Sequence, residues 1–185
     1  PDDDCWYASD TLAEVVASFK AYPQCGALLG AWTPNPDAPR PTGKTAPLST
    51  TSLFQQGGTC VQFFRKEAVQ GLRFDPVLGP GTGLPYGCGE DTDYLLYAHK
   101  NALVLRNFRI AVFHPSPIDS IPSAEKIARY AAGRMFLLKK HKFSKLFVAI
   151  NVLYPLCIMP LDFFRYGKQV AWYRWRMFIE RLRNC

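Results

Sequence analysis

Along the first 113 residues, apolar side chains recur at helical spacing in some segments and form short continuous runs in others. A capping-box pattern at Thr11–Glu14 is followed by apolar side chains at helical spacing as far as Pro23, which predicts an amphipathic helix. Residues 25–33 form a short, continuous apolar run that ends before a proline, which predicts a buried strand. The same reading predicts a strand at 59–64, a helical turn at 65–70, a helix at 91–101 and a strand at 103–113.

Prolines, glycines and small polar residues predict long surface loops at 34–58 and 71–89, between these elements. Strands that alternate with helices are typical of an α/β fold. We therefore expect an α/β class for this part of the chain.

The last third of the chain has a different pattern. Ser123 opens a predicted basic helix that continues to about residue 142. The apolar run 146–161 is shorter than the roughly 20 residues that span a bilayer, and Asn151, Pro155 and Pro160 interrupt it. Aromatic residues and arginines then alternate through 163–183. The run 146–161 therefore fits a re-entrant or interfacial segment, or a buried helix, and the Trp, Tyr and Arg residues of 163–183 favour the headgroup region of a membrane.

Charge divides the chain at the same place. Residues 1–122 have 9 Lys/Arg and 12 Asp/Glu, whereas residues 123–185 have 13 Lys/Arg and 3 Asp/Glu. An acidic front and a basic tail predict two separate roles: metal binding by the front, and contact with an anionic membrane or a nucleic acid by the tail. The six cysteines form no C-x-x-C pair, so no zinc site is predicted and reduced thiols are expected.

Three carboxylates gather in the segment Gly87-Cys88-Gly89-Glu90-Asp91-Thr92-Asp93, directly before the helix predicted at 91–101. Acids at a helix N-terminus interact favourably with the helix dipole and with free N–H groups. Such a carboxylate can act as a base, a metal ligand or simply a helix cap. The loop before it lacks the G-x-x-x-x-G-K-[ST] pattern of a phosphate loop.

A second acidic cluster, Asp2-Asp3-Asp4, opens the chain. Asp2 and Asp4 would point to the same side of an extended strand end, where their oxygens suit Mg²⁺ or Mn²⁺. Such a cation neutralises the diphosphate leaving group of a nucleotide-sugar, while a separate carboxylate takes the proton of the attacking hydroxyl. Two acidic clusters in an α/β chain fit this chemistry.

In this respect the chain resembles the family 2 glycosyltransferases, which have the GT-A nucleotide-diphospho-sugar transferase fold. The resemblance covers residues 1–116. Its most specific part is the order Phe64-Arg65-Lys66, then Gly71-Leu72-Arg73-Phe74-Asp75-Pro76-Val77-Leu78-Gly79, then Gly89-Glu90-Asp91-Thr92-Asp93.

The resemblance implies a role for each candidate site residue. Asp91 is the expected catalytic base, and Glu90 holds it or orients the acceptor. Asp2, Asp3 and Asp4 bind the donor diphosphate, with Asp2, Asp4 and His114 as ligands of Mg²⁺ or Mn²⁺. A histidine at a strand end is more often a structural hydrogen-bonding residue than a ligand, so His114 also has a structural interpretation. Tyr86, Gly89 and Asp93 lie on the acceptor side, and Asp93 also caps the helix.

The resemblance further implies a partial GT-A domain at 1–116, whose N-terminal nucleotide-binding half precedes Pro1. Residues 117–185 are expected to be a basic, helical extension that holds the protein on the cytoplasmic face of the cell membrane through 123–185. The implied activity is inverting transfer of a sugar to a glycan or lipid-linked acceptor, in cell-surface polysaccharide or glycoconjugate synthesis. Nucleic acid is not a partner in this reading.

Two other functions remain open at this stage. The basic tail is also typical of a non-enzymatic module that binds a membrane surface or a nucleic acid, and such binding would weaken steeply with salt. The same acids would also suit a metal-dependent phosphotransferase or hydrolase. The order of the motifs favours the glycosyltransferase.

Overall fold

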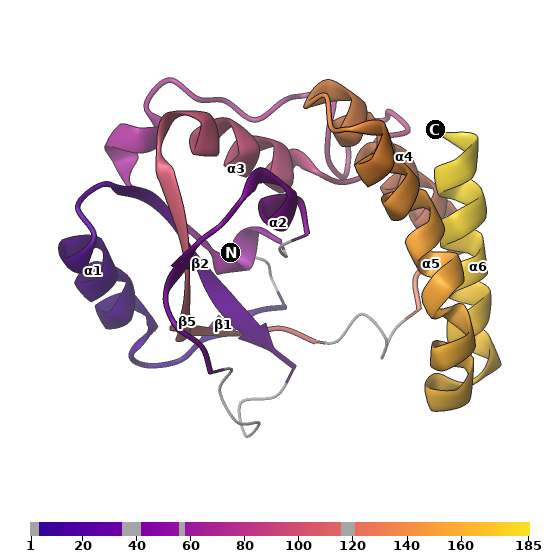
Figure 1. Cartoon of the computed structure of the whole chain (residues 1–185), viewed down its shortest axis with the longest axis horizontal. Coiled ribbons are helices and arrows are strands. Elements are labelled where there is room, and N and C mark those ends of the chain that lie inside the picture. The colour runs from indigo at the N-terminus through magenta and orange to yellow at the C-terminus, as the bar shows by residue number, and fades with distance from the viewer. Residues whose placement is uncertain (1–3, 35–41, 56–57, 116–120) are drawn as a thin grey trace. The chain divides into compact units, whose positions relative to one another are not determined.

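The computed structural model describes residues 4–34, 42–55, 58–115 and 121–185. It is a mixed α/β structure with a curled sheet and several helices, which confirms the predicted α/β class in general terms (Figure 1). The chain divides into two compact units. The first contains residues 1–74 and 91–116, and the second contains residues 75–90 and 117–185. Segment 75–90 thus groups with the C-terminal helices rather than with the rest of residues 1–116.

The first unit is built on a sheet in the order β1-β5-β2-β4, with β3 also paired to β5. The two longest strands, β2 (Cys25–Thr33) and β5 (Leu103–Phe113), are parallel and have the predicted bounds. Antiparallel pairing joins the short strands β1 (Trp6–Tyr7), β3 (Ala46–Pro47) and β4 (Gln62–Phe64) to them. The helices of this unit are α1 (Thr11–Ala21), α2 (Thr50–Phe54) and α3 (Glu90–Asn101), and 3₁₀ turns occupy Thr59–Val61 and Lys66–Val69.

The structure differs from the prediction mainly in short elements. The expected loop 34–58 contains β3 and α2, and the expected strand 59–64 begins as a 3₁₀ turn. Elements of two to five residues are too short to show a hydrophobic period. Helix α2 instead depends on a local cap, because the Ser49 hydroxyl accepts a hydrogen bond from the backbone N–H of Ser52.

The core of the first unit lies between α1 and the paired strands β2 and β5. Val15, Cys25, Leu28, Leu105 and Ile110 form one buried cluster. The β2–β5 register shifts at Gly30, where an added Cβ would lie 2.8 Å from the carbonyl oxygen of Ile110. Glycine at this position therefore permits the close approach of the two strands.

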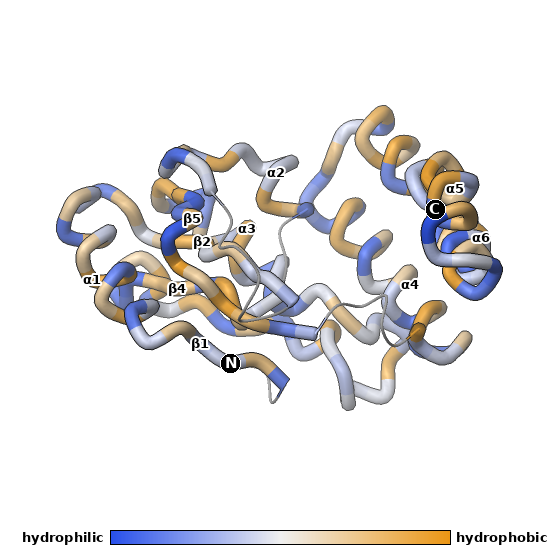
Figure 2. Tube along the Cα trace, turned by 90° about the horizontal axis from the view of Figure 1, so that it is seen from below, coloured by the Kyte–Doolittle hydropathy of each residue, from blue (hydrophilic) through white to orange (hydrophobic). Residues whose placement is uncertain are grey.

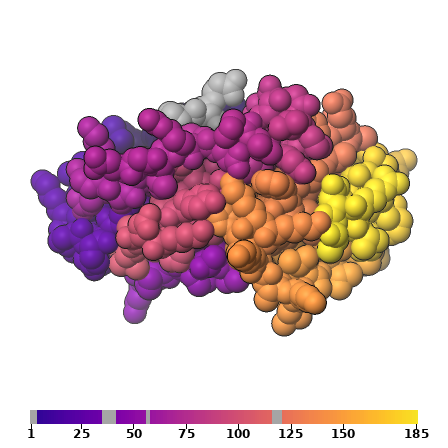
Figure 3. All heavy atoms as spheres, turned by 90° about the horizontal axis from the view of Figure 1, so that it is seen from above, coloured from indigo at the N-terminus to yellow at the C-terminus, as the bar shows by residue number. Residues whose placement is uncertain are grey.

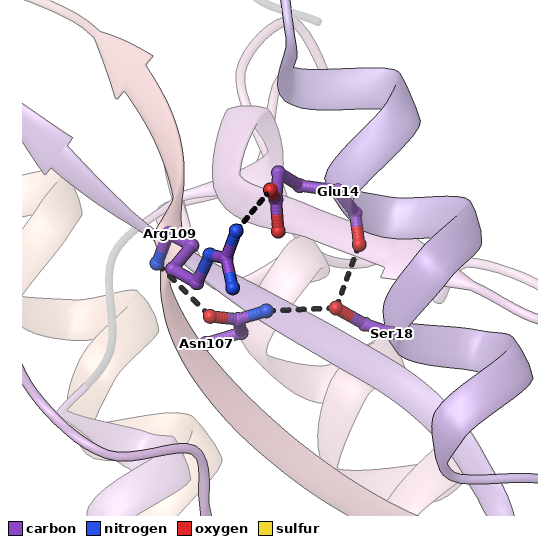
Figure 4. Close-up of polar contacts among 4 residues, drawn as sticks. All are labelled: Glu14, Ser18, Asn107 and Arg109. Atoms are coloured by element: carbon purple, nitrogen blue, oxygen red, sulfur yellow. Dashed lines mark hydrogen bonds and ion pairs between the residues drawn. The ribbon is translucent and has the colours of Figure 1, made fainter.

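Helix α1 is fixed to β5 by polar contacts (Figure 4). Glu14 pairs with Arg109 at 2.8 Å. The buried Asn107 amide donates to the Ser18 hydroxyl at 2.7 Å, and the Asn107 side-chain oxygen accepts from the Arg109 backbone N–H at 2.9 Å. The Thr11 hydroxyl donates to the Ala111 carbonyl, and Asp10 is the N-cap. The predicted capping box is therefore wrong, because both of its side chains contact β5 instead.

The second unit contains α4 (Ala124–Lys140), α5 (Lys145–Tyr166) and α6 (Lys168–Arg183). Helix α6 packs against both α4 and α5, and its yellow atoms lie against the orange atoms of those helices in Figure 3. Ser123 and Ser144 cap α4 and α5 by accepting backbone N–H groups at 3.2 Å.

Helix α5 continues through Pro155 and Pro160, so the predicted interruption is wrong. A proline at 155 cannot donate to the carbonyl of Asn151, four residues earlier. The guanidinium of Arg181 on α6 donates to that carbonyl at 2.7 Å and replaces the missing hydrogen bond. The resulting helix has 22 residues, and by length and composition alone it is long and apolar enough to cross a bilayer.

Candidate functional site

The structure brings Asp4 and His114 together at one end of the sheet. Strand β1 runs antiparallel to β5 with Trp6 opposite Phe113, so the residues just before Trp6 lie beside the residues just after Phe113. The backbone N–H of His114 donates to the carbonyl of Thr33, the last residue of β2. Asp4 Oδ1 lies 3.3 Å from His114 Nε2. Strand pairing therefore positions both side chains at the carboxyl ends of β2 and β5.

The hydrogen bonds of His114 define which ring nitrogen is available. His114 Nδ1 lies 2.7 Å from the carbonyl oxygen of Pro115, and a carbonyl can only accept, so Nδ1 carries the proton. In the neutral ring the lone pair is then on Nε2, which lies beside the Asp4 carboxylate. Two such electron-rich atoms repel unless a proton or a cation lies between them. The pair is therefore suited to an imidazolium–carboxylate ion pair or to a shared cation.

The Asp4–His114 geometry fits a divalent cation. Adjacent ligand atoms about 2.1 Å from an octahedral ion are roughly 3 Å apart, close to the 3.3 Å observed. A carboxylate with an imidazole suits Mn²⁺ better than Mg²⁺, because nitrogen ligands favour transition metals. The side chains are 56% exposed for Asp4 and 30% for His114. A ligand can therefore reach both.

The third expected metal ligand, Asp2, lies outside the described residues, as does the expected diphosphate-binding residue Asp3. Asp4 itself lies in a turn before β1. Within the described ranges, no group of three or more His, Cys, Asp or Glu side chains gathers around one point. A complete ligand set for Mg²⁺ or Mn²⁺ would need Asp2 or groups from the donor.

The glycine turn before α3 is held against α4 in the second unit. The Gly87 N–H donates to the Arg129 carbonyl at 3.1 Å. Gly89 has a φ of +105°, and an added Cβ there would lie 2.6 Å from Leu137. An added Cβ on Gly133 of α4 would lie 2.4 Å from the Cys88 carbonyl oxygen. These glycines therefore let the backbone of the turn lie directly on the helix.

Glu90 and Asp91 follow this glycine turn and are the first two residues of α3. The Oε2 atom of Glu90 is buried without a hydrogen-bond partner and lies against Gly79, whose added Cβ would be 3.2 Å away. Asp91 is partly exposed, and its Oδ1 atom accepts from the Thr92 backbone N–H at 2.6 Å. A buried carboxylate oxygen without a donor is costly. The Glu90 oxygen is therefore an unsatisfied acceptor inside the structure, directly before the partly exposed Asp91.

Asp93 and Tyr86 have more enclosed surroundings than predicted. Asp93 is 1% exposed and lies beyond the first positions of α3. The backbone carbonyl of Tyr86 accepts a hydrogen bond from the N–H of Gly79. The Tyr86 ring packs on Phe136, with the two ring centroids 4.5 Å apart. The adjacent Tyr94 of α3 stacks on Phe74 at 4.5 Å. These contacts fix the backbone on either side of Glu90 and Asp91.

A polar cavity of about 460 Å³ lies beside the same turn in the second unit. Its lining combines hydroxyl, charged and aromatic groups: Pro80, Gly87, Ser123, Glu125, Lys126, Arg129 and Tyr130. The sequence interpretation missed these α4 residues. Their basic character was visible, but nothing in the pattern joined them to Gly87.

Comparison of the chain with family models, curated proteins and solved structures finds no match.

Proposed function

We propose that this protein is a metal-dependent glycosyltransferase with a GT-A fold, which transfers a sugar from a nucleotide-diphosphate donor to a hydroxyl of a glycan or lipid-linked acceptor. The observation that carries the proposal is the Asp4–His114 pair, whose atoms lie 3.3 Å apart at the carboxyl ends of two parallel strands. Ligand sites in α/β sheets commonly lie at this edge. The motif order described above supplies the reaction class.

In the proposed reaction, Asp2, Asp4 and His114 would hold Mg²⁺ or Mn²⁺. The bound cation would stabilise the negative charge of the leaving group. Asp91 takes the proton from the acceptor hydroxyl as the hydroxyl oxygen bonds to the anomeric carbon. The bond from that carbon to the diphosphate breaks, and the nucleoside diphosphate leaves with the electron pair. Glu90 holds Asp91 in place or orients the acceptor. We expect inversion at the anomeric carbon.

We assign the acceptor to the side of the chain that contains Tyr86 and Gly89. The polar cavity beside Gly87 supports this assignment, because it offers a tyrosine ring together with charged and hydroxyl groups. Sugars are bound by such mixtures of apolar faces and hydrogen-bonding groups. Asp93 is buried, so we place its contribution in supporting the helix rather than in direct contact with the acceptor.

We further propose that the second unit lies on the cytoplasmic surface of the membrane. One side of α5 is apolar and exposed along its whole length, at helical spacing: Leu146, Ile150, Leu153, Cys157, Leu161 and Phe164. The tube of α5 is largely orange in Figure 2, whereas α6 has blue segments. Basic residues around such a face are attracted to the anionic cytoplasmic leaflet.

The packing of α5 on α6 favours a position in the membrane surface over a crossing. Asp162 of α5 pairs with Arg174 of α6 at 2.7 Å, and Arg181 donates to the Asn151 carbonyl. If α5 crossed the bilayer with α6 attached, the charges of α6 would enter the hydrocarbon. Arginine at the bilayer centre costs at least about 2.5 kcal/mol. A shallow, surface-lying α5 avoids this cost.

The proposed reaction is tested by identifying its products. The natural full-length protein would be incubated with nucleotide-sugars, Mn²⁺ and membrane-extracted glycolipid acceptors. We expect nucleoside diphosphate and glycosylated acceptor in equal amounts, and neither product after chelation of the metal. Free sugar or inorganic phosphate without acceptor product would indicate a hydrolase or phosphotransferase. No turnover, together with salt-sensitive binding to membranes or nucleic acid, would indicate a non-enzymatic module.

A further inference from the structure

A second cavity, of about 540 Å³, lies at the start of α6 in the second unit. It is lined by Ile121, Pro122, Lys168, Gln169 and Trp172. Three of these side chains are apolar, one is an amide and one is an ammonium. A cavity that combines an apolar wall with a single cation is suited to a molecule that has both a chain and an anionic group.

This cavity adjoins the membrane-facing side of α5 in the chain. The exposed face of α5 ends at Phe164, which is 84% exposed. Gly167, with a φ of +83°, then joins α5 to α6 in a single residue. Lys168 and Trp172 follow within the first turns of α6, and Trp172 is 47% exposed. Three of the five residues that line the cavity, Lys168, Gln169 and Trp172, thus follow the exposed face of α5 within a few positions of the chain.

The start of α6 also has no side-chain cap. Gly167 is its N-cap and has no side chain to accept the first backbone N–H groups. Free N–H groups at a helix start favour an anion. The neighbouring ammonium of Lys168 adds a positive charge at the same place, whereas none of the residues that line the cavity is acidic.

We propose that this cavity binds one anionic phospholipid of the bilayer. Its phosphate is bound by Lys168 and the first N–H groups of α6, Gln169 contacts the ester region, and the acyl chain lies against Ile121, Pro122 and Trp172. Free phosphate would leave the apolar wall uncovered, and a neutral lipid would leave the ammonium without a partner. This inference rests on the proposed membrane association of the second unit.

The test uses the whole chain labelled with 5-fluorotryptophan and observed by ¹⁹F NMR, with Trp172→Phe to assign the Trp172 signal. Dihexanoyl phosphatidic acid, kept below its critical micelle concentration, is the probe. We expect a saturable shift of the Trp172 signal. Lys168→Gln should weaken binding at least about tenfold, since charge-assisted hydrogen bonds are among the strong ones. Lys145→Gln removes the same charge from the exposed start of α5 and should change the affinity less than about twofold.

Three results would overturn the proposal. The first is a shift of the Trp172 signal by inorganic phosphate with the same affinity as dihexanoyl phosphatidic acid. The second is the same result with dihexanoyl phosphatidylcholine. The third is an equal loss of affinity in Lys168→Gln and Lys145→Gln, which would show that the anionic lipid is attracted by the overall positive charge and not by Lys168. Flotation with liposomes separates this inference from the broader one. Liposome binding with no response at Trp172 refutes the lipid site alone, whereas a specific response without liposome binding refutes the membrane association alone.

Discussion

At the scale of single residues, the proposed cation site depends on the contact between Asp4 Oδ1 and His114 Nε2, which lie 3.3 Å apart. The sequence placed His114 at the end of a strand and Asp4 in an acidic cluster. Their contact arises from the register of β1 on β5, and β1 has only two residues. A two-residue strand has no detectable alternation. The family resemblance predicted Asp4 and His114 as ligands of one cation, whereas sequence spacing alone could not have predicted their contact.

The pair predicts a measurable effect on cation binding. His114→Gln should lower Mn²⁺ affinity at least about tenfold, a loss of about 1.4 kcal/mol. Asp4→Asn should lower it more, because a carboxylate also supplies charge to a hard cation. Electron paramagnetic resonance of free Mn²⁺ measures both without an enzyme assay. His141→Gln, at the C-cap of α4, is the matched control. Unchanged binding in both variants would remove this pair from the metal site.

At the scale of elements, the strands β2 and β5 were predictable, whereas the continuity of the long helix α5 was not. The bounds of β2 and β5 follow directly from continuous apolar runs. The continuity of α5 was missed because Arg181, far along the chain, replaces the hydrogen bond that Pro155 cannot make. Burial and the neighbouring Arg134 lower the pKa of Arg181 to about 9. Sequence patterns show local preferences, whereas this contact is tertiary.

The segment 75–90 is fixed to α4 at its first residue by a pair that predicts a pH effect. Lys140 donates to Asp75 at 2.5 Å, and this hydrogen bond lowers the pKa of the Asp75 carboxyl. The folded state therefore binds this proton less tightly than the unfolded state does. The pair's stabilisation is complete above the ordinary carboxyl pKa of about 3.9 and is lost as the pH falls through the lower folded value.

Lys140→Gln should accordingly lower the free energy of unfolding by about 1 kcal/mol at pH 7, with the difference vanishing in strong acid. Urea unfolding across pH 2–7 measures this. Lys139→Gln serves as the control, because Lys139 contacts the carbonyl of Asn184, which does not titrate. A Lys140→Gln difference that stayed constant with pH would show that the pair does not account for the pKa shift.

At the scale of the whole molecule, the α/β class and the change of character after residue 116 were predictable from composition and period. The grouping of 75–90 with the C-terminal helices was not. That grouping depends on close backbone contacts at Gly87, Gly89 and Gly133. A glycine in a sequence indicates a special conformation or a close approach, but does not identify the partner.

The exposed face of α5 predicts how the molecule binds membranes. Leu153→Glu should abolish most binding to anionic liposomes, because it places a charge at an apolar position that is 47% exposed. Leu12→Glu, at a leucine of α1 that is 68% exposed, should bind like the wild type. Rising salt should release part of the bound protein, since screening weakens only the electrostatic contribution. A protease-protected segment with its two ends on opposite sides of the bilayer would refute the surface position.

The most direct test of the central claim compares Asp91→Asn with Asp93→Asn in the natural full-length protein. Both substitutions keep the size of the side chain. If Asp91 is the base, its substitution should lower the transfer rate by about 10²–10⁴-fold while nucleotide-sugar affinity is retained. The buried Asp93 should show a smaller loss that follows protein stability. Normal transfer by Asp91→Asn with an inactive Asp93→Asn would assign the base to the wrong carboxylate, and full activity of both would show that the acidic motif is only the start of a helix.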